Sequence, residues 1–327
     1  MRDQLLDFLR CPACQAERSL TLAADARDER EVRDGTLGCA ECGHSFDVRE
    51  GIAELLHEPP DFVVKEGAGL ERFADLMREH GWDRQKIRSL PDIEDGYWHG
   101  QRASFDQLTN IVDFRPGQSL LDVGSNTCWA SNLFAERGLE VIALDITRAE
   151  MQGLRTAEYF IDSGEVYFER ILSTMADPAI ASESLDYVFC CEVLHHNDLR
   201  AMKRTFKEIY RVLKPAAKLL VINEPMRFPL NLKRDHAEEV AHFEGNEHVH
   251  FFHQYYLSAR RAGFDVRVCL RRPTCQPDVL ALDDRARRVA YTVVRHAARR
   301  LRVTRRAYLA WMMLIAGDSS LNMICEK

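Results

Sequence analysis

Four cysteines near the start of the chain have the spacing of a metal site. They form two pairs, Cys11-Pro12-Ala13-Cys14 and Cys39-Ala40-Glu41-Cys42, with 24 residues between the pairs. Thiolates spaced in this way bind zinc in a tetrahedral arrangement. Because four thiolates leave no position for water, the spacing predicts a structural zinc held by Cys11, Cys14, Cys39 and Cys42. His44 is an alternative ligand in place of Cys42.

Two carboxylates follow apolar runs at the spacing of an adenosine site. Asp122 lies within the run 119–123, and Asp145 ends the run 141–144, about 20 residues past the first turn. Ligands of open parallel sheets bind beyond the carboxyl ends of the strands. A carboxylate at Asp145 can accept hydrogen bonds from both ribose hydroxyls. Asp122 can orient the turn or meet a positive group of the ligand.

The turn after the first of these runs differs from a dinucleotide site. It reads Gly124-Ser125-Asn126-Thr127-Cys128 instead of Gly-x-Gly-x-x-Gly, which aims amides at a pyrophosphate. It favours a ligand without phosphate, and its acidic surroundings favour a sulfonium. Asn126 tolerates a left-handed backbone, so the turn survives there. Cys128 is expected inside the following helix.

The elements that would position these residues alternate between strands and helices. The expected strands are 119–123, 141–144, 166–172, 185–191, 218–222, 264–270 and 321–325, and the expected helices are 2–9, 127–137, 199–213 and 255–262, with further helices within 61–112. Short apolar strands separated by helices predict a doubly wound, mostly parallel sheet covered on both faces. We expect this α/β sheet to be Rossmann-like and seven-stranded.

The chain as a whole has the composition of an α/β protein with an attachment. It has 327 residues, of which 46% are hydrophobic, and a formal net charge of −7, which argues against a protein whose whole surface binds nucleic acid. There is no secretion signal or spanning apolar segment. Ten cysteines without such a signal indicate thiols and metal instead of disulfides, and a cytoplasmic location.

Four motifs between residues 119 and 223 resemble those of class I S-adenosylmethionine-dependent methyltransferases. They are Leu121-Asp122-Val123-Gly124, Val141 to Ile146, Leu185 to His196, and Glu208 to Pro215. The resemblance implies S-adenosylmethionine as the cofactor, with Asp145 holding the ribose. The implied cofactor-binding residues are Asp122, Gly124, Ser125, Asn126, Asp145, Ile146, Thr174, Met175 and Cys191. The chain departs from the family in its glycine turn and in lacking an acid near Ser173-Thr174-Met175.

The same resemblance implies the catalytic side of the site. Residues after the fourth strand face the cofactor's methyl group in the family, which places Glu192, His195, His196 and Asn197 near the chemistry. A histidine there can take a proton from a hydroxyl or an amine. The alternative is that His195 and His196 only line the pocket wall.

The cysteine-rich segment resembles the zinc ribbon of the small activator subunit of tRNA and protein methyltransferases. The likeness lies in Leu5 to Pro12 and Phe46 to Leu56. Similar ribbons precede ribosomal RNA guanine methyltransferases and many others, so the ribbon does not identify the substrate. We expect a zinc-ribbon domain at 1–58, a helical linker or cap at 59–112, and a methyltransferase domain at 113–327.

Three further segments have more than one interpretation. Tyr97-Trp98-His99 either closes the site or packs in the core. His242, His248, His250 and His253 either bind a metal or line the rim of the substrate pocket. Nine arginines between residues 285 and 306 lie in a predicted helical insertion, 278–317, which presents a solvated or packing face, or binds an anionic partner.

The sequence therefore predicts a methyltransferase acting on a small molecule or biosynthetic intermediate, with a structural zinc. One alternative is an RNA methyltransferase that uses the ribbon and the arginine-rich helices on phosphates. Another is a protein that transfers a different carbon of the sulfonium or serves as a scaffold. A small-molecule substrate is the favoured partner, nucleic acid is the alternative, and a homodimer is an open expectation.

Overall fold

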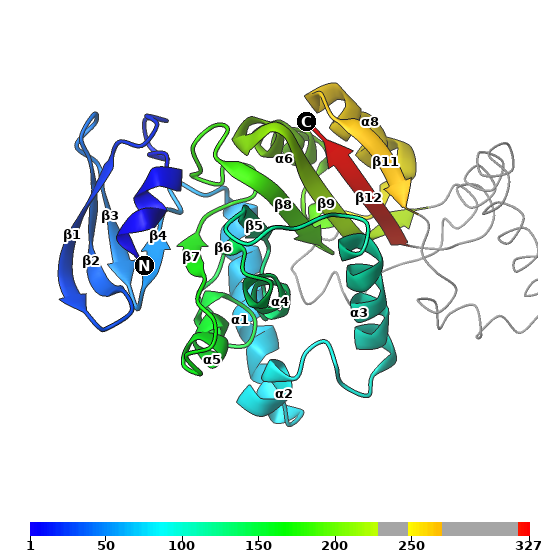
Figure 1. Ribbon diagram of the computed structural model, residues 1–327, viewed down its shortest axis with the longest axis horizontal. Coiled ribbons are helices and arrows are strands. Elements are labelled where there is room, and N and C mark those ends of the chain that lie inside the picture. The colour runs from blue at the N-terminus through cyan, green and yellow to red at the C-terminus, as the bar shows by residue number, and fades with distance from the viewer. Residues whose placement is uncertain (228–247, 270–319) are drawn as a thin grey trace, which may run out of the picture.

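One continuous sheet runs through the molecule (Figure 1). The computed structural model describes residues 1–227, 248–269 and 320–327. The strands are β1 (Leu20–Arg27), β2 (Val32–Cys39), β3 (Ser45–Arg49), β4 (Ile52–Glu54), β5 (Ser119–Val123), β6 (Glu140–Asp145), β7 (Glu169–Leu172), β8 (Leu185–Cys191), β9 (Leu213–Arg227), β10 (His250–Phe251), β11 (Asp265–Cys269) and β12 (Ser320–Glu326). Their order is β1-β2-β3-β4-β7-β6-β5-β8-β9-β12-β11, and β10 pairs with β9.

The central part of this sheet is the predicted mostly parallel sheet. Strands β4, β7, β6, β5, β8 and β9 are parallel to one another, whereas β12 runs antiparallel to both β9 and β11. The prediction of a Rossmann-like fold is confirmed. The predicted count of seven strands is too low, because β4 pairs with β7 and thereby joins the strands of the cysteine-rich segment to the same sheet, which has twelve strands.

Helices cover both faces of the sheet. They are α1 (Asp61–Glu79), α2 (Arg84–Arg88), α3 (Gly96–Thr109), α4 (Trp129–Glu136), α5 (Glu158–Ile161), α6 (Leu199–Val212) and α8 (Phe252–Ala262), with 3-10 helices at Asp3–Phe8, Leu154–Ala157 and Leu194–His196. Successive residues of a strand point to opposite faces. Leu121 therefore packs with Phe206 of α6, whereas Leu120 packs in the cluster of Phe105 and Phe134 from α3 and α4.

Two expected boundaries are wrong. The helix expected at 127–137 begins only at Trp129, because Cys128 has a left-handed backbone (φ 57°) and precedes the helix instead of lying inside it. The strand expected at 218–222 is β9, which begins directly after α6 and extends to residue 227. The part of β9 from Lys218 to Pro225 pairs with β12.

Ion pairs join the cysteine-rich segment to the sheet. The guanidinium of Arg170 in β7 is fully buried and contacts the carboxylates of Glu31 and Glu158. Arg148, just after β6, contacts Glu50 at 2.8 Å and Glu54 at 2.6 Å. Backbone pairing of β4 with β7 and these charged contacts tie the segment to the strands that carry the predicted cofactor site.

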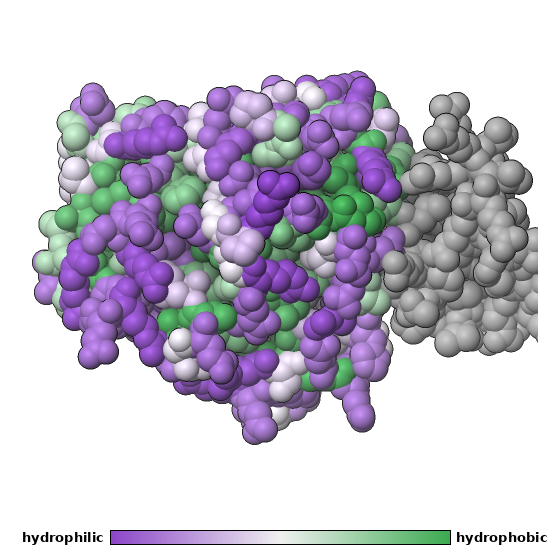
Figure 2. Space-filling view, viewed as in Figure 1, coloured by the Kyte–Doolittle hydropathy of each residue, from purple (hydrophilic) through white to green (hydrophobic). Residues whose placement is uncertain are grey.

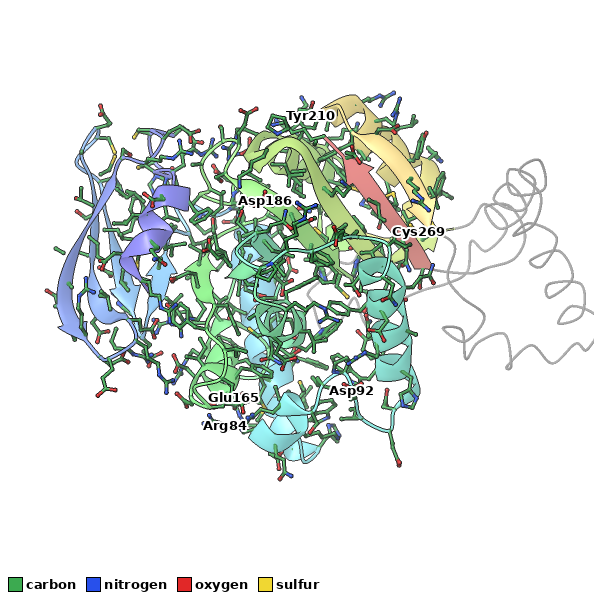
Figure 3. The ribbon with its side chains drawn as sticks, in the orientation of Figure 1. Arg84, Asp92, Glu165, Asp186, Tyr210 and Cys269 are labelled. Carbon is green, nitrogen blue, oxygen red and sulfur yellow. The ribbon has the colours of Figure 1, made fainter. Side chains whose placement is uncertain are left out.

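Asp186 lies at the amino-terminal end of β8 and joins it to the neighbouring strands (Figure 3). Its Oδ2 accepts hydrogen bonds from the amide and the hydroxyl of Ser119 at 3.0 and 2.9 Å and from Nζ of Lys214 at 2.9 Å. This arrangement fixes β5 against β8 and β9. Because these strands are parallel, their carboxyl ends all lie at the same end of the sheet.

The outer surface is mostly hydrophilic on the face shown in Figure 2, and its hydrophobic residues lie in separate patches. None of the helices in the described ranges has the length and hydrophobicity needed to cross a membrane. The predicted arginine-rich insertion, 278–317, and His242 lie outside the described residues.

Candidate functional site

The four cysteines converge at one point. The Sγ atoms of Cys11, Cys14, Cys39 and Cys42 all lie within 4.8 Å of one another. Both pairs sit in turns: the first follows the N-terminal 3-10 helix, and the second follows the end of β2. In the described part of the chain, no other group of three metal-binding side chains gathers in this way, so His248, His250 and His253 do not form such a site.

The sulfur positions fit zinc. Cys11 Sγ lies 3.8 Å from Cys42 Sγ, and Cys14 Sγ lies 3.7 Å from Cys39 Sγ. A tetrahedron with zinc–sulfur bonds of about 2.3 Å has edges of about 3.8 Å. The site therefore has the dimensions of a four-thiolate zinc site, with Cys42 and not His44 as the fourth ligand.

The turn after β5 takes a left-handed path. Gly124, Asn126 and Cys128 all have positive φ, at 68°, 46° and 57°. A side chain at Gly124 would collide with Val193, so this position requires glycine. Asn126 takes the left-handed conformation that was expected of it. The turn thus keeps its shape although the glycines usual in the family are absent.

The carboxylate of Asp145 is anchored by the same turn. Its Oδ2 accepts the amide of Asn126 at 2.9 Å, and its Oδ1 accepts the amides of Ile146 at 2.8 Å and Thr147 at 3.2 Å. Burial raises the pKa of Asp145 to about 6, against the effect of these amides and with a further contribution from the charge of Glu66. Oδ1 already accepts two amides, whereas Oδ2 accepts one and keeps a lone pair for a ribose hydroxyl.

Asp122 lies beside it, one strand away. Its Oδ2 accepts a hydrogen bond of 2.6 Å from the hydroxyl of Ser131 in α4. Burial raises the pKa of Asp122 to about 7, and the charge of Asp145 adds to the rise. Two carboxylates held together in this way disfavour their own ionisation, so a cationic ligand would stabilise both.

A cavity of about 1000 Å³ opens beyond these strand ends. Its floor is formed by the ends of β5, β6 and β8, and its cover by α1, α3 and the segment 57–60 before α1. Every residue predicted for cofactor binding or catalysis lines it: Asp122, Gly124, Ser125, Asn126, Asp145, Ile146, Thr174, Met175, Cys191, Glu192, His195 and His196. The tertiary structure therefore gathers the predicted residues around one space.

Glu192 stands at the end of β8 on one side of the cavity. It has a left-handed backbone (φ 49°), and its Oε2 accepts a hydrogen bond of 2.5 Å from the hydroxyl of Tyr97. Burial raises the pKa of Glu192, although the bond from Tyr97 opposes this. Tyr97 and Trp98 begin α3 and line the cavity, whereas His99 does not. Tyr97-Trp98 thus forms a side of the site, as one of the two interpretations predicted.

His195 is held by a buried carboxylate from the next strand. Glu224 in β9 has no exposed surface, and its Oε2 lies 3.1 Å from Nδ1 of His195. Oε1 of Glu224 also accepts the amides of Val193 and Leu194 at 2.7 and 2.8 Å. A carboxylate in this position fixes the imidazole and favours a proton on Nδ1. Nε2 is then the ring nitrogen that carries the basic lone pair.

His196 turns toward the cover of the cavity. Its Nδ1 lies 3.0 Å from Oε1 of Glu66 in α1. The neighbouring His250 reaches the same loop, since its Nε2 contacts the carbonyl of Asn197 at 2.8 Å. Burial lowers the pKa of His250. His250 therefore supports the loop that follows β8.

Sequence reasoning missed several residues of the site. It did not single out Glu224, which holds His195, or Gln101, which lines the cavity and accepts a hydrogen bond of 2.5 Å from Asn223. Glu66 was also missed, although its position gives a signal. It shares a helical face with Leu70 and Met77, so an acid interrupts an otherwise apolar stripe.

Two family comparisons agree with this geometry. Residues 121–221 match the methyltransferase domain family, and residues 2–51 match the family of Trm112p-like proteins. The chain therefore contains a methyltransferase domain preceded by a Trm112-like zinc ribbon. The match of residues 121–221 agrees with the sequence motifs that predicted an S-adenosylmethionine-dependent methyltransferase, and the four-cysteine cluster agrees with the predicted zinc.

Solved structures with a similar fold were also found. Phosphoethanolamine N-methyltransferase 2 from Haemonchus contortus is 19% identical, with a TM-score of 0.49, over 78% of this chain and 60% of the other. A complex of the Trm112 methyltransferase activator of Haloferax volcanii with a putative methyltransferase is 13% identical, with a TM-score of 0.47, over 83% and 99%. The chain thus spans less than two thirds of the Haemonchus protein. No curated protein sequence matches it.

Proposed function

We propose that the chain methylates a small molecule bound in the cavity between the strand ends and helices α1 and α3. The observation that carries this proposal is the cavity of about 1000 Å³, which is lined both by the predicted cofactor residues and by Glu192, His195 and Tyr97. Small-molecule sites usually measure about 300–1000 Å³. The cavity has room for the cofactor together with a small acceptor.

The cofactor residues have distinct roles in this proposal. Asp145 binds a ribose hydroxyl through Oδ2, and the left-handed turn at Gly124 brings its backbone against the methionine part of the cofactor. Asp122 faces the positively charged part of the cofactor. Thr174 and Met175 lie beside the adenine in this proposal. The Thr174 hydroxyl already accepts a hydrogen bond of 3.1 Å from the amide of Asp177.

His195 is the proposed base, and Glu224 is the residue that positions it. The acceptor atom attacks the methyl carbon as the carbon–sulfur bond breaks, and the enzyme chiefly aligns the two. Nε2 of His195 takes the proton that the acceptor loses. Glu192 and His196 complete the wall around the acceptor.

An RNA acceptor fits the described residues less well. Six carboxylates line the cavity, at Glu58, Glu66, Asp122, Asp145, Asp177 and Glu192, whereas its lysine and arginine lining consists of Arg204 alone within the described ranges. Phosphates bind where basic side chains gather. The acidic lining therefore favours a small neutral or cationic acceptor.

The domain division is also a proposal. We place the zinc ribbon at 1–58, the cap at 59–112 and the methyltransferase domain at 113–327. The break between the first two falls between the end of β4 and the start of α1. The homodimer and the cytoplasmic location remain predictions.

One labelling experiment tests the function. The chain is incubated with methyl-labelled S-adenosylmethionine and either a protein-free small-molecule extract or total RNA, and the Asp145→Ala variant serves as the control. We expect S-adenosylhomocysteine and label in a small molecule, and neither product with the variant. Label in RNA contradicts the small-molecule proposal. Methylthioadenosine as the by-product contradicts methyl transfer itself.

A further inference from the structure

The cavity is lined by more acidic than basic side chains. In the described ranges, six carboxylates and one guanidinium line it. Asp177 is paired with Arg10 at 2.8 Å and with Arg204 at 3.4 Å, and Glu66 lies 3.0 Å from Nδ1 of His196. Glu192 instead contacts neutral groups, the hydroxyl of Tyr97 and the side chain of Gln101. A positive ligand is therefore a suitable partner for this carboxylate.

The acid on the acceptor side is Glu192. It lies at the strand end that faces Tyr97 and Trp98, and both aromatic residues line the same cavity. Tyr97 donates to Oε2 of Glu192 and the side chain of Gln101 also bonds this carboxylate, whose four lone pairs leave acceptor positions for a ligand. The rings of Tyr97 and Trp98 meet edge to face, with centroids 5.2 Å apart.

Aromatic faces beside a carboxylate form a site for an ammonium group. More than half of Tyr97 is exposed, at 56%, so its ring is available to a ligand at the mouth of the cavity. The nearby Trp82 differs, since Nζ of Lys86 already lies 4.1 Å from the centre of its ring. The aromatic surface of Tyr97 and Trp98 therefore lies beside Glu192 in the cavity.

We infer that the acceptor atom is an amine nitrogen, held by the carboxylate of Glu192 and the rings of Tyr97 and Trp98. This inference rests on the proposed methyl transfer to a small molecule and names its substrate class. The position of His195 agrees with it, because this residue lines the same cavity and its Nδ1 is held by Glu224.

The charges that change during the reaction favour nitrogen over oxygen. The lone pair of a neutral amine forms the new N–C bond, while the electrons of the S–C bond return to sulfur and leave neutral S-adenosylhomocysteine. Positive charge thus moves from sulfur to nitrogen. Carboxylates stabilise a charge of this sign. A protonated amine first gives one proton to Nε2 of His195, and the methylated product carries the new positive charge.

A hydroxyl acceptor would develop charge of the opposite sign. Methyl transfer to oxygen proceeds through an oxyanion or a hydroxyl that loses its proton as it attacks. Negative charge on oxygen would then develop among the carboxylates of the cavity, which repel it. The same lining that suits an amine therefore opposes an alcohol or a phenol.

A pair of probes of equal shape tests the inference. Choline carries a trimethylammonium group, and 3,3-dimethylbutan-1-ol has the same shape with a neutral carbon in place of nitrogen. Each is titrated by calorimetry into the full chain saturated with S-adenosylhomocysteine. We expect choline to bind at least tenfold more tightly, which corresponds to about 1.4 kcal/mol. Equal binding, tighter binding of the alcohol, or no saturable choline binding would overturn the inference.

Two variants assign the preference to its residues. Glu192→Gln and Trp98→Leu should each reduce choline affinity about tenfold, which is about 1.4 kcal/mol, and leave the affinity of the alcohol unchanged. Glu71→Gln changes an exposed acid of α1 that does not line the cavity, and it should change neither affinity. Unchanged choline affinity in Glu192→Gln would contradict the assignment. Circular dichroism and zinc content establish that the variants are folded.

The proposed function fails in a different way from the inference. If the chain does not bind S-adenosylhomocysteine, the proposed function is wrong whatever the choline result. If it binds S-adenosylhomocysteine and shows no preference for choline, only the amine assignment is wrong.

Discussion

The imidazole of His195 lies 3.1 Å from the carboxylate of Glu224, although the two residues come from different strand connections. His195 is in the loop after β8, and Glu224 is near the end of β9. The same carboxylate accepts the amides of Val193 and Leu194. One buried side chain thus fixes both the loop and the ring proposed as the base.

The first prediction concerns this pair. Glu224→Gln keeps the shape of the side chain and removes its charge, so the loop stays in place and the imidazole becomes a weaker base. We expect kcat, measured as S-adenosylhomocysteine formation, to fall about 100-fold while cofactor affinity is retained. His195→Ala should lose a similar factor, and the double variant no more than either alone. Additive losses would show that the two residues act separately.

The second prediction concerns the pH dependence of cofactor binding. Burial raises the pKa of Asp145 to about 6, so the carboxylate that accepts a ribose hydroxyl becomes protonated as the pH falls through this value. Affinity for S-adenosylmethionine should therefore decrease about tenfold between pH 7 and pH 5. Calorimetry of the wild type and Asp145→Asn checks this. The variant should bind weakly at both values, whereas Asp25→Asn, an exposed acid in β1, should behave as the wild type. Equal pH dependence in Asp145→Asn would contradict the assignment.

The third prediction concerns stability without ligand. Burial raises the pKa of Asp122 to about 7, above the ordinary value of 3.8. Between these values the folded protein binds a proton that the unfolded chain does not, so this residue lowers the free energy of unfolding as the pH rises toward 7. Asp122→Asn should therefore raise stability at pH 8 by roughly 1–4 kcal/mol and leave it nearly unchanged at pH 4. Denaturant unfolding at both values measures the difference. A variant destabilised equally at both would show that the effect is one of packing.

The fourth prediction concerns zinc. The chain should contain one zinc ion per molecule, and the double variant Cys39→Ser/Cys42→Ser should contain none, because two thiolates cannot complete the tetrahedron. Unfolding of the ribbon should accompany the loss, since a structural zinc contributes directly to folding. Metal analysis and thermal unfolding are the measurements. Cys269→Ser, in β11 and far from the cluster in sequence, is the control and should keep its zinc.

The fifth prediction concerns the contact between the ribbon and the sheet. Glu31→Ala would remove one of the two carboxylates in contact with the fully buried Arg170 and leave that of Glu158. Removing one partner of a buried ion pair costs about 3–5 kcal/mol, whereas an exposed pair contributes about 0–1 kcal/mol. Asp3→Ala breaks the exposed contact with Arg27 and serves as the matched control. Equal stability of the two variants in denaturant would contradict a structural role for the buried pair.

Some features of the site could be predicted because they are local in the sequence. The four cysteines could be identified from their spacing. Asp122 and Asp145 could be identified from their positions at the ends of apolar runs. The left-handed Asn126 also follows from residue type, since asparagine tolerates this backbone. Cys128 does not, because its left-handed backbone is set by the turn that precedes α4 and not by its own preference.

Other features depend on contacts between distant parts of the chain. Pairing of β4 with β7 merges the ribbon with the sheet, and this pairing leaves no pattern within either strand. Glu66 reaches His196 only because α1 folds over the cavity, and Glu224 reaches His195 only because β9 lies beside β8.

The sequence by itself determined the class of fold, the zinc ligands and the carboxylates of the cofactor site. Each of these depends on residue type and short spacing, which act through local backbone geometry and strand order. The tertiary structure decided which side chains surround the acceptor. Burial and charge gather Glu192, Tyr97, Trp98 and the His195–Glu224 pair there, and these contacts join elements that are far apart along the chain.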